Sequence, residues 1–124
     1  MKTHHTDDAP KAVGPYSQAM SVDGWLFTSG QVGLDPATGK LVAGGFEAQA
    51  RQVLANLRAI LLNAAVDFDR VIKVTVYLAD MNDFGKLNAI YSEALGSHRP
   101  ARTTVQAAGL PIGAAIEIDM VARL

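Results

Sequence analysis

Two charged side chains stand among small or apolar neighbours, and their types could carry proton transfer and carboxylate binding. Glu117 lies in the apolar run from Ala114 to Ile118, a strand-like context that disfavours glutamate. A partly buried carboxyl there would have a raised pKa and could transfer protons near neutral pH; the ordinary alternative is an exposed glutamate on an outer strand face. Arg102 precedes the small neutral residues 103–107 and could bind a carboxylate through two hydrogen bonds. That carboxylate could belong to a small acid or to Glu117, or Arg102 could form an ordinary surface ion pair.

Four uncharged residues are weaker candidates. Ser29 and Gly30 end an expected strand, where glycine either lets a ligand approach the backbone or simply forms a bulge. No histidine and carboxylate accompany Ser29 in the sequence, so a nucleophilic serine is not expected. Tyr16 could present its phenol at a strand entry or pack in the core with its hydroxyl at the surface. Asn88 falls within a predicted helix, where a position facing solvent is the ordinary one.

The composition excludes several classes of site. The 124 residues are expected to form one domain over 1–124, and 49% of them are hydrophobic, which excludes a disordered chain. Eleven basic residues oppose twelve acidic ones without a basic cluster, so neither nucleic acid nor a membrane surface is an expected partner. The chain has no cysteine and three histidines, two of them adjacent near the start, so no metal site is expected. No apolar run is long enough for a membrane span or a signal peptide, and we expect a cytoplasmic protein.

The periodicity of apolar residues predicts the elements that position these candidates. Spacings of three and four predict helices over 46–65 and 83–95, the second ending at Gly96. In the 70–79 strand, alternation places Ile72 on the same face as Val74, and Val71 on the other face. Alternation and turn residues predict strands over the following ranges: 16–20, 25–30, 70–79, 102–107 and 114–122.

Two helices are too few to cover both faces of such a sheet, so an α+β fold with both helices on one face is expected. The other face is then partly apolar and partly charged. It could be solvated, as in many antiparallel sheets, or it could be a subunit interface.

Taken in order, the motifs resemble the Rid family of reactive intermediate (enamine/imine) deaminases, also called the YjgF family. Each motif is weak alone, but the ordered set covers nearly the whole chain. The resembling segments are Gly14–Ala19, Ser29–Gln31, Pro36–Gly39, Val74–Leu78, Asp83–Phe84 with Asn88 and Tyr91, Pro100–Arg102, Leu110–Pro111 and Ile116–Ile118.

The resemblance implies a chorismate-mutase-like fold with a mixed β-sheet, and a homotrimer that packs through the helix-free sheet face. Active sites would lie in clefts between subunits. The implied reaction is hydrolysis of 2-aminoacrylate and related enamine/imine acids to 2-keto acids and ammonia, without a cofactor. Such intermediates arise from pyridoxal-phosphate enzymes, which gives the expected functional link.

The resemblance also assigns roles. Arg102 would clamp the substrate carboxylate, and Glu117 would position or activate the attacking water. Backbone groups at Ser29 and Gly30 would lie against the substrate. Tyr16 would wall the pocket, and Asn88 would orient or line it.

Two departures from the family pattern leave alternatives open. Thr104 stands where many members carry cysteine, which argues against a thiol-dependent activity while leaving a residue that can line the pocket and bind substrate. The segment 91–100 before Arg102 is shorter than in typical members, so the substrate size could differ. A 2-aminomuconate-type deaminase and a non-enzymatic small-acid sensor or chaperone-like module are the alternatives.

Overall fold

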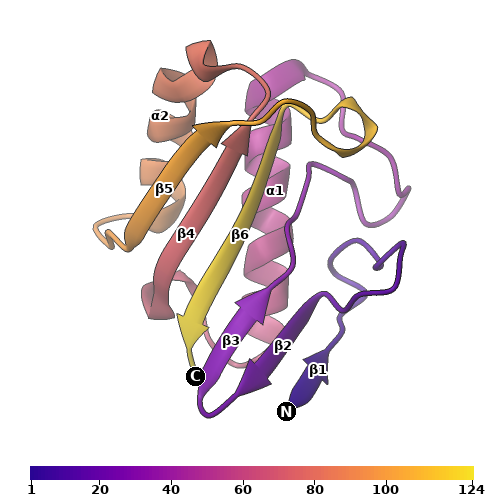
Figure 1. Ribbon diagram of the computed structural model, residues 1–124, viewed down its shortest axis with the longest axis vertical. Helices are drawn as coiled ribbons and strands as arrows, with labels where there is room; N and C mark the ends of the chain where they lie inside the picture. Colours follow the sequence, from indigo (N-terminus) through magenta and orange to yellow (C-terminus); the bar gives the residue numbers. More distant parts are fainter.

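The computed structural model describes residues 1–124 and contains one six-stranded sheet with the strand order β1-β2-β3-β6-β4-β5 (Figure 1). All neighbouring strands are antiparallel except β4 and β5, so the sheet is mixed. The strands are β1 (Lys2–His4), β2 (Ala19–Val22), β3 (Trp25–Thr28), β4 (Val71–Leu78), β5 (Ala101–Gln106) and β6 (Ile116–Arg123).

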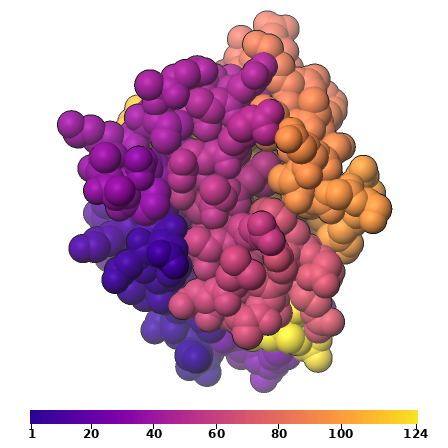
Figure 2. Space-filling model, turned by 180° about the vertical axis from the view of Figure 1, so that it is seen from behind, coloured from indigo at the N-terminus to yellow at the C-terminus, as the bar shows by residue number.

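Both helices lie on the same side of the sheet, behind it in Figure 1 and toward the viewer in Figure 2. Helix α1 (Gly45–Asn63) connects β3 to β4, and α2 (Phe84–Leu95) connects β4 to β5. Because β3, β4 and β5 run in the same direction, each helix is a crossover between parallel strands, and crossovers of one hand place their helices on one face. Helix α2 ends at Gly96, which has a positive φ of 63°.

The core lies between the helices and the inner sheet face and contains 22 buried apolar residues. Strand β6 supplies Ile116, Ile118 and Met120 to this core, while Glu117 and Asp119 point to the helix-free face. This alternation fixes the face on which every functional side chain of the central strands lies.

Two buried amides hold the irregular segments beside the sheet. The Gln18 side chain accepts a hydrogen bond from the Thr6 backbone and donates to the carbonyls of Thr6 and Pro10. Asn56 of α1, which is 1% exposed, donates to the backbone carbonyls of Val32 and Leu34. These bonds hold residues 6–10 against Gln18, and they hold residues 32–34, which follow Gly30 closely in the chain, against α1.

The expected α+β, chorismate-mutase-like architecture with two helices on one face is confirmed. The short strand β1 was not predicted, because its polar residues show no apolar alternation. The strand expected at 16–20 begins only at Ala19, after a turn closed by the Tyr16 N–H and the Gly14 carbonyl at 2.8 Å.

The predicted facing of Ile72 was wrong. A register irregularity between Val71 and Lys73 turns Val71 into the core and leaves Ile72 45% exposed. Beyond the bulge, Val74, Val76 and Leu78 face the helices as predicted. Neither helix combines the length and the apolar character needed to cross a lipid bilayer.

Candidate active site

Arg102 lies on the helix side of the edge strand β5. Its register partner in the parallel β4 is Val74, which is fully buried under the helices, and paired residues share a face. Thr104 pairs with the buried Val76 and therefore lies on the same side. The Thr104 Oγ1 atom is buried and has no hydrogen-bond partner within the chain.

Helix α2 holds the Arg102 guanidinium in place. Its Nη2 atom donates a hydrogen bond to Asn88 Oδ1 at 2.6 Å. The guanidinium carbon lies 4.8 Å from the ring centre of Tyr91 and 5.6 Å from that of Phe84. Arg102 forms no ion pair with a carboxylate of its own chain. Most of its five N–H donors therefore remain free for an acidic ligand.

Glu117 lies on the other, helix-free face of the sheet, where it pairs with Tyr77 in the β4–β6 register. Its carboxylate packs against Gly30, so closely that a Cβ atom on Gly30 would lie 2.7 Å from Glu117 Oε2. The absent side chain of Gly30 thus makes the space that Glu117 occupies. The Gly30 backbone N–H takes no part in the backbone hydrogen bonds of the surrounding loops.

Burial is the main cause that raises the pKa of Glu117, and the neighbouring Asp119 raises it further. Burial also raises the pKa of Asp119, opposed by its hydrogen bond with Tyr77 and by the charge of Lys73. A carboxyl with a raised pKa is a stronger base than an ordinary glutamate once it is ionised, which suits it to accept a proton from water.

Ser29 and Tyr16 lie beside Gly30. The Ser29 hydroxyl donates to the Ser17 carbonyl at 2.6 Å, so this side chain joins two backbone segments. Tyr16 is 50% exposed, and its hydroxyl accepts a weak hydrogen bond from the Val13 N–H at 3.4 Å. Tyr16 and Gly30 both line a small hollow between the segments 10–18 and 30–34.

The predicted site residues thus form two separate groups. Arg102, Asn88 and Thr104 gather between β5 and α2. Glu117, Gly30, Ser29 and Tyr16 gather near the other face and its adjoining loop. An ion pair between Arg102 and Glu117, one of the expectations for this arginine, does not form within the chain.

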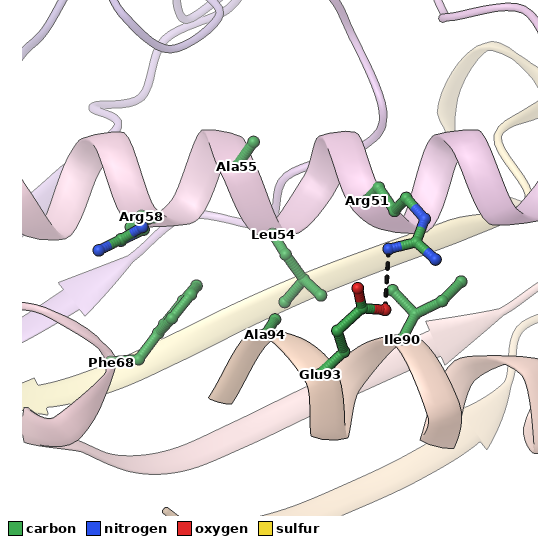
Figure 3. Close-up of a pocket in the computed structure, with 8 residues that line it drawn as sticks. All are labelled: Arg51, Leu54, Ala55, Arg58, Phe68, Ile90, Glu93 and Ala94. Carbon is green, nitrogen blue, oxygen red and sulfur yellow. Dashed lines mark hydrogen bonds and ion pairs between the residues drawn. The ribbon is translucent and has the colours of Figure 1, made fainter. Parts of the chain in front are cut away.

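A separate groove runs between α1 and α2 and contains none of the predicted site residues (Figure 3). Leu54 of α1 and Ile90 of α2 point toward each other across it, and an ion pair between Arg51 and Glu93 closes one side at 3.0 Å. Its other arginine, Arg58, is paired with Asp67 at 2.9 Å. With both arginines neutralised, this groove lacks a free charged group for catalysis.

Sequence reasoning did not assign a role to the two aromatic contacts of Arg102. Phe84 and Tyr91 stand four residues before and three after Asn88, so all three share one helix face. That spacing was the signal in the sequence that could have indicated the cluster. Asn88 itself is half-buried, and its side chain contacts Arg102. No cluster of three histidine or acidic side chains is arranged to hold a metal ion.

The mixed sheet and the two helices on one of its faces define the chain as an α+β protein. The family described as Endoribonuclease L-PSP matches residues 6–124. The chain belongs to this family, which is the YjgF or Rid family of the sequence resemblance.

Named relatives agree with this assignment. A mouse 2-iminobutanoate/2-iminopropanoate deaminase is 51% identical over 98% of this chain and 90% of the relative. A RutC family protein of Pyrococcus horikoshii is 50% identical over 94% of this chain and 93% of the relative. The crystal structure of RidA from an Antarctic Psychrobacter superposes with a TM-score of 0.96 at 43% identity, and all of both chains is covered.

Proposed function

We propose that this chain is an enamine/imine deaminase, which hydrolyses small 2-imino acids to 2-keto acids and ammonia. The observation that carries the proposal is the full-length similarity, at 51% identity, to a relative named 2-iminobutanoate/2-iminopropanoate deaminase. The free guanidinium of Arg102 and the half-buried carboxyl of Glu117 support it, because they supply the two groups that the reaction needs.

Arg102 binds the substrate carboxylate. Its remaining N–H donors can form a paired hydrogen bond with the two carboxylate oxygens. The carboxylate is bonded directly to the imine carbon of a 2-imino acid, so an arginine that holds the carboxylate also sets the position of the imine carbon. Asn88 accepts one hydrogen bond from Nη2, so the other N–H groups of the guanidinium remain available to the substrate carboxylate.

Glu117 holds and activates the attacking water. The water oxygen bonds to the imine carbon, and its protons pass through the Glu117 carboxylate to the nitrogen. The C–N bond then breaks, ammonia leaves, and the carbonyl of the 2-keto acid forms. Tyr16 and the Gly30 backbone line the approach to Glu117, and Thr104 lines the pocket on the Arg102 side.

The separation of Arg102 and Glu117 supports sites shared between two copies of the chain. Side chains on opposite faces of one sheet do not converge on one small molecule within a chain, so we propose that Arg102 of one copy meets Glu117 of another. The helix-free face carries exposed apolar side chains suited to such an interface, namely Met20, Val22, Phe27 and Val105. With the family resemblance, this arrangement leads us to propose a homotrimer that acts in the cytoplasm on intermediates released by pyridoxal-phosphate enzymes.

A coupled assay tests the proposed activity. A serine/threonine dehydratase supplied with serine or threonine releases the unstable enamine/imine acid, and adding this protein is expected to accelerate the formation of the 2-keto acid. Arg102→Ala is expected to abolish that acceleration while the protein stays folded and assembled. If the folded wild-type protein gives no acceleration, the deaminase proposal is wrong.

The name of the matching family also suggests cleavage of RNA. The net charge of −1, with lysines and arginines scattered along the chain, gives no surface that would gather a polyanion. We therefore place nucleic acid outside the proposed function.

A further inference from the structure

We propose that Tyr91, with Phe84, is a positioning residue whose ring holds the Arg102 guanidinium in the orientation that binds substrate. The inference rests on the proposed function, because it concerns how Arg102 binds a carboxylate. Neither aromatic residue touches the reacting atoms. Their action is through Arg102.

The helix α2 presents three residues to Arg102 from one face. Phe84, Asn88 and Tyr91 are spaced by four and three residues, which places them one above another on successive turns. Asn88 Oδ1 accepts a hydrogen bond from Nη2 at one edge of the guanidinium. The rings of Phe84 and Tyr91 both lie within cation–π distance of the guanidinium carbon. One hydrogen bond alone would let the guanidinium turn about that bond; the ring contacts remove this freedom.

The contribution of Tyr91 comes from its ring and not from its hydroxyl. Tyr91 is 5% exposed, and its hydroxyl oxygen is buried without a hydrogen-bond partner in the chain. Burial raises the pKa of the phenol, against the opposing charges of Arg102 and Arg99, so the ring stays neutral at physiological pH. A phenylalanine at this position would keep the ring contact with Arg102. It would lose no hydrogen bond within the chain, because the Tyr91 hydroxyl makes none.

Fixing the guanidinium matters because arginine side chains are otherwise free to rotate. A free arginine must lose that freedom when it binds, and the loss weakens binding. An arginine already held by Asn88 and Tyr91 has made this loss during folding, and its other N–H donors have no partner in the chain. Removing the Tyr91 ring should therefore weaken carboxylate binding without altering the attack of water on bound substrate.

Three variants separate the ring from the hydroxyl and from simple packing. Tyr91→Phe is expected to leave KM and the Kd for 2-oxobutanoate within about twofold of wild type. Tyr91→Leu is expected to raise both by on the order of tenfold, with kcat changed much less. Phe84→Leu, at a more exposed position, is a second test should Tyr91→Leu fail to fold. It is expected to raise KM and Kd less than Tyr91→Leu does, because the Phe84 ring lies farther from Arg102.

A double-mutant comparison distinguishes positioning from loss of structure. In an Arg102→Ala background, Tyr91→Leu is expected to cause no further loss of 2-oxobutanoate binding, because there is no guanidinium to hold. Equal losses in both backgrounds, or unchanged binding in Tyr91→Leu and Phe84→Leu, would overturn the inference. If Arg102→Ala itself binds and turns over like wild type, the proposed clamp fails instead, so the two failures are distinguishable.

Discussion

Replacing Gly30 with alanine probes the contact between Gly30 and Glu117. The added Cβ would lie 2.7 Å from Glu117 Oε2 and 2.8 Å from Cδ, whereas ordinary contact begins at 3.4 Å. The carboxylate must therefore move by 0.7 Å, the difference between 3.4 and 2.7 Å. Gly30 does not have a positive φ, so alanine is compatible with its backbone and the strain falls on the Glu117 side chain.

A displacement of this size at a group that positions water should be costly. Misplacement by about 1 Å can lower a rate by about a hundredfold, so we expect Gly30→Ala to reduce kcat/KM by about 10- to 100-fold. The assay is the dehydratase-coupled release of 2-keto acid, with thermal unfolding measured in parallel. Binding of 2-oxobutanoate, which depends mainly on Arg102, is expected to change less than kcat.

Gly109→Ala is the matched control. No atom lies within 4 Å of the added Cβ, and Gly109 does not have a positive φ. We expect this variant to keep wild-type activity. If Gly30→Ala retains full activity as well, or loses activity only in proportion to unfolded protein, Glu117 does not act from the position described.

Three further predictions concern pH and stability. Asp119→Asn removes a charge that raises the pKa of Glu117, so the acid limb of the kcat/KM profile should shift to lower pH; a limb that stays in place would show that Asp119 exerts no such influence. Asp67→Ala should lower the free energy of unfolding, measured in urea near neutral pH, by about 1 kcal/mol, because Asp67 accepts a hydrogen bond from the Phe68 N–H and pairs with Arg58. Asp67→Asn should lower it less, because an asparagine can still accept the hydrogen bond from Phe68. The pKa of Asp67 is lowered in the folded state, so the difference between Asp67→Ala and wild type should shrink as the pH falls through that pKa, and a constant difference would contradict it. Leu57→Ala, at a fully buried position, should cost about 2–5 kcal/mol, and a cost below 1 kcal/mol would place Leu57 outside a well-packed core.

The fold could be predicted from the sequence wherever one periodicity extended over a long segment. Helix α1 and the inner face of β6 follow directly from their apolar spacing. The face of Ile72 was predicted wrongly because the bulge adds a residue to the strand, and the apolar residues of the sequence do not reveal it. Strand β1 was missed because it pairs through its backbone and contributes few apolar side chains.

The sequence singled out candidate site residues but did not reveal how they are arranged. Unusual contexts pointed to Arg102 and Glu117 separately. Their placement on opposite faces depends on the parallel β4–β5 register and the antiparallel β4–β6 register, which local spacing does not reveal. The contact of Gly30 with Glu117 likewise joins distant segments, through the bridge between Gln31 and Ile118.

The central claim is that Arg102 of one copy and Glu117 of another act on the same substrate, and complementation between two inactive variants tests it most directly. Arg102→Ala and Glu117→Gln chains are co-expressed with different tags, and the mixed oligomers are purified through both tags. If sites are shared, pairing an intact Arg102 with an intact Glu117 restores one site in every mixed trimer, or about one third of the wild-type activity. Mixed oligomers that stay as inactive as either parent would contradict the claim.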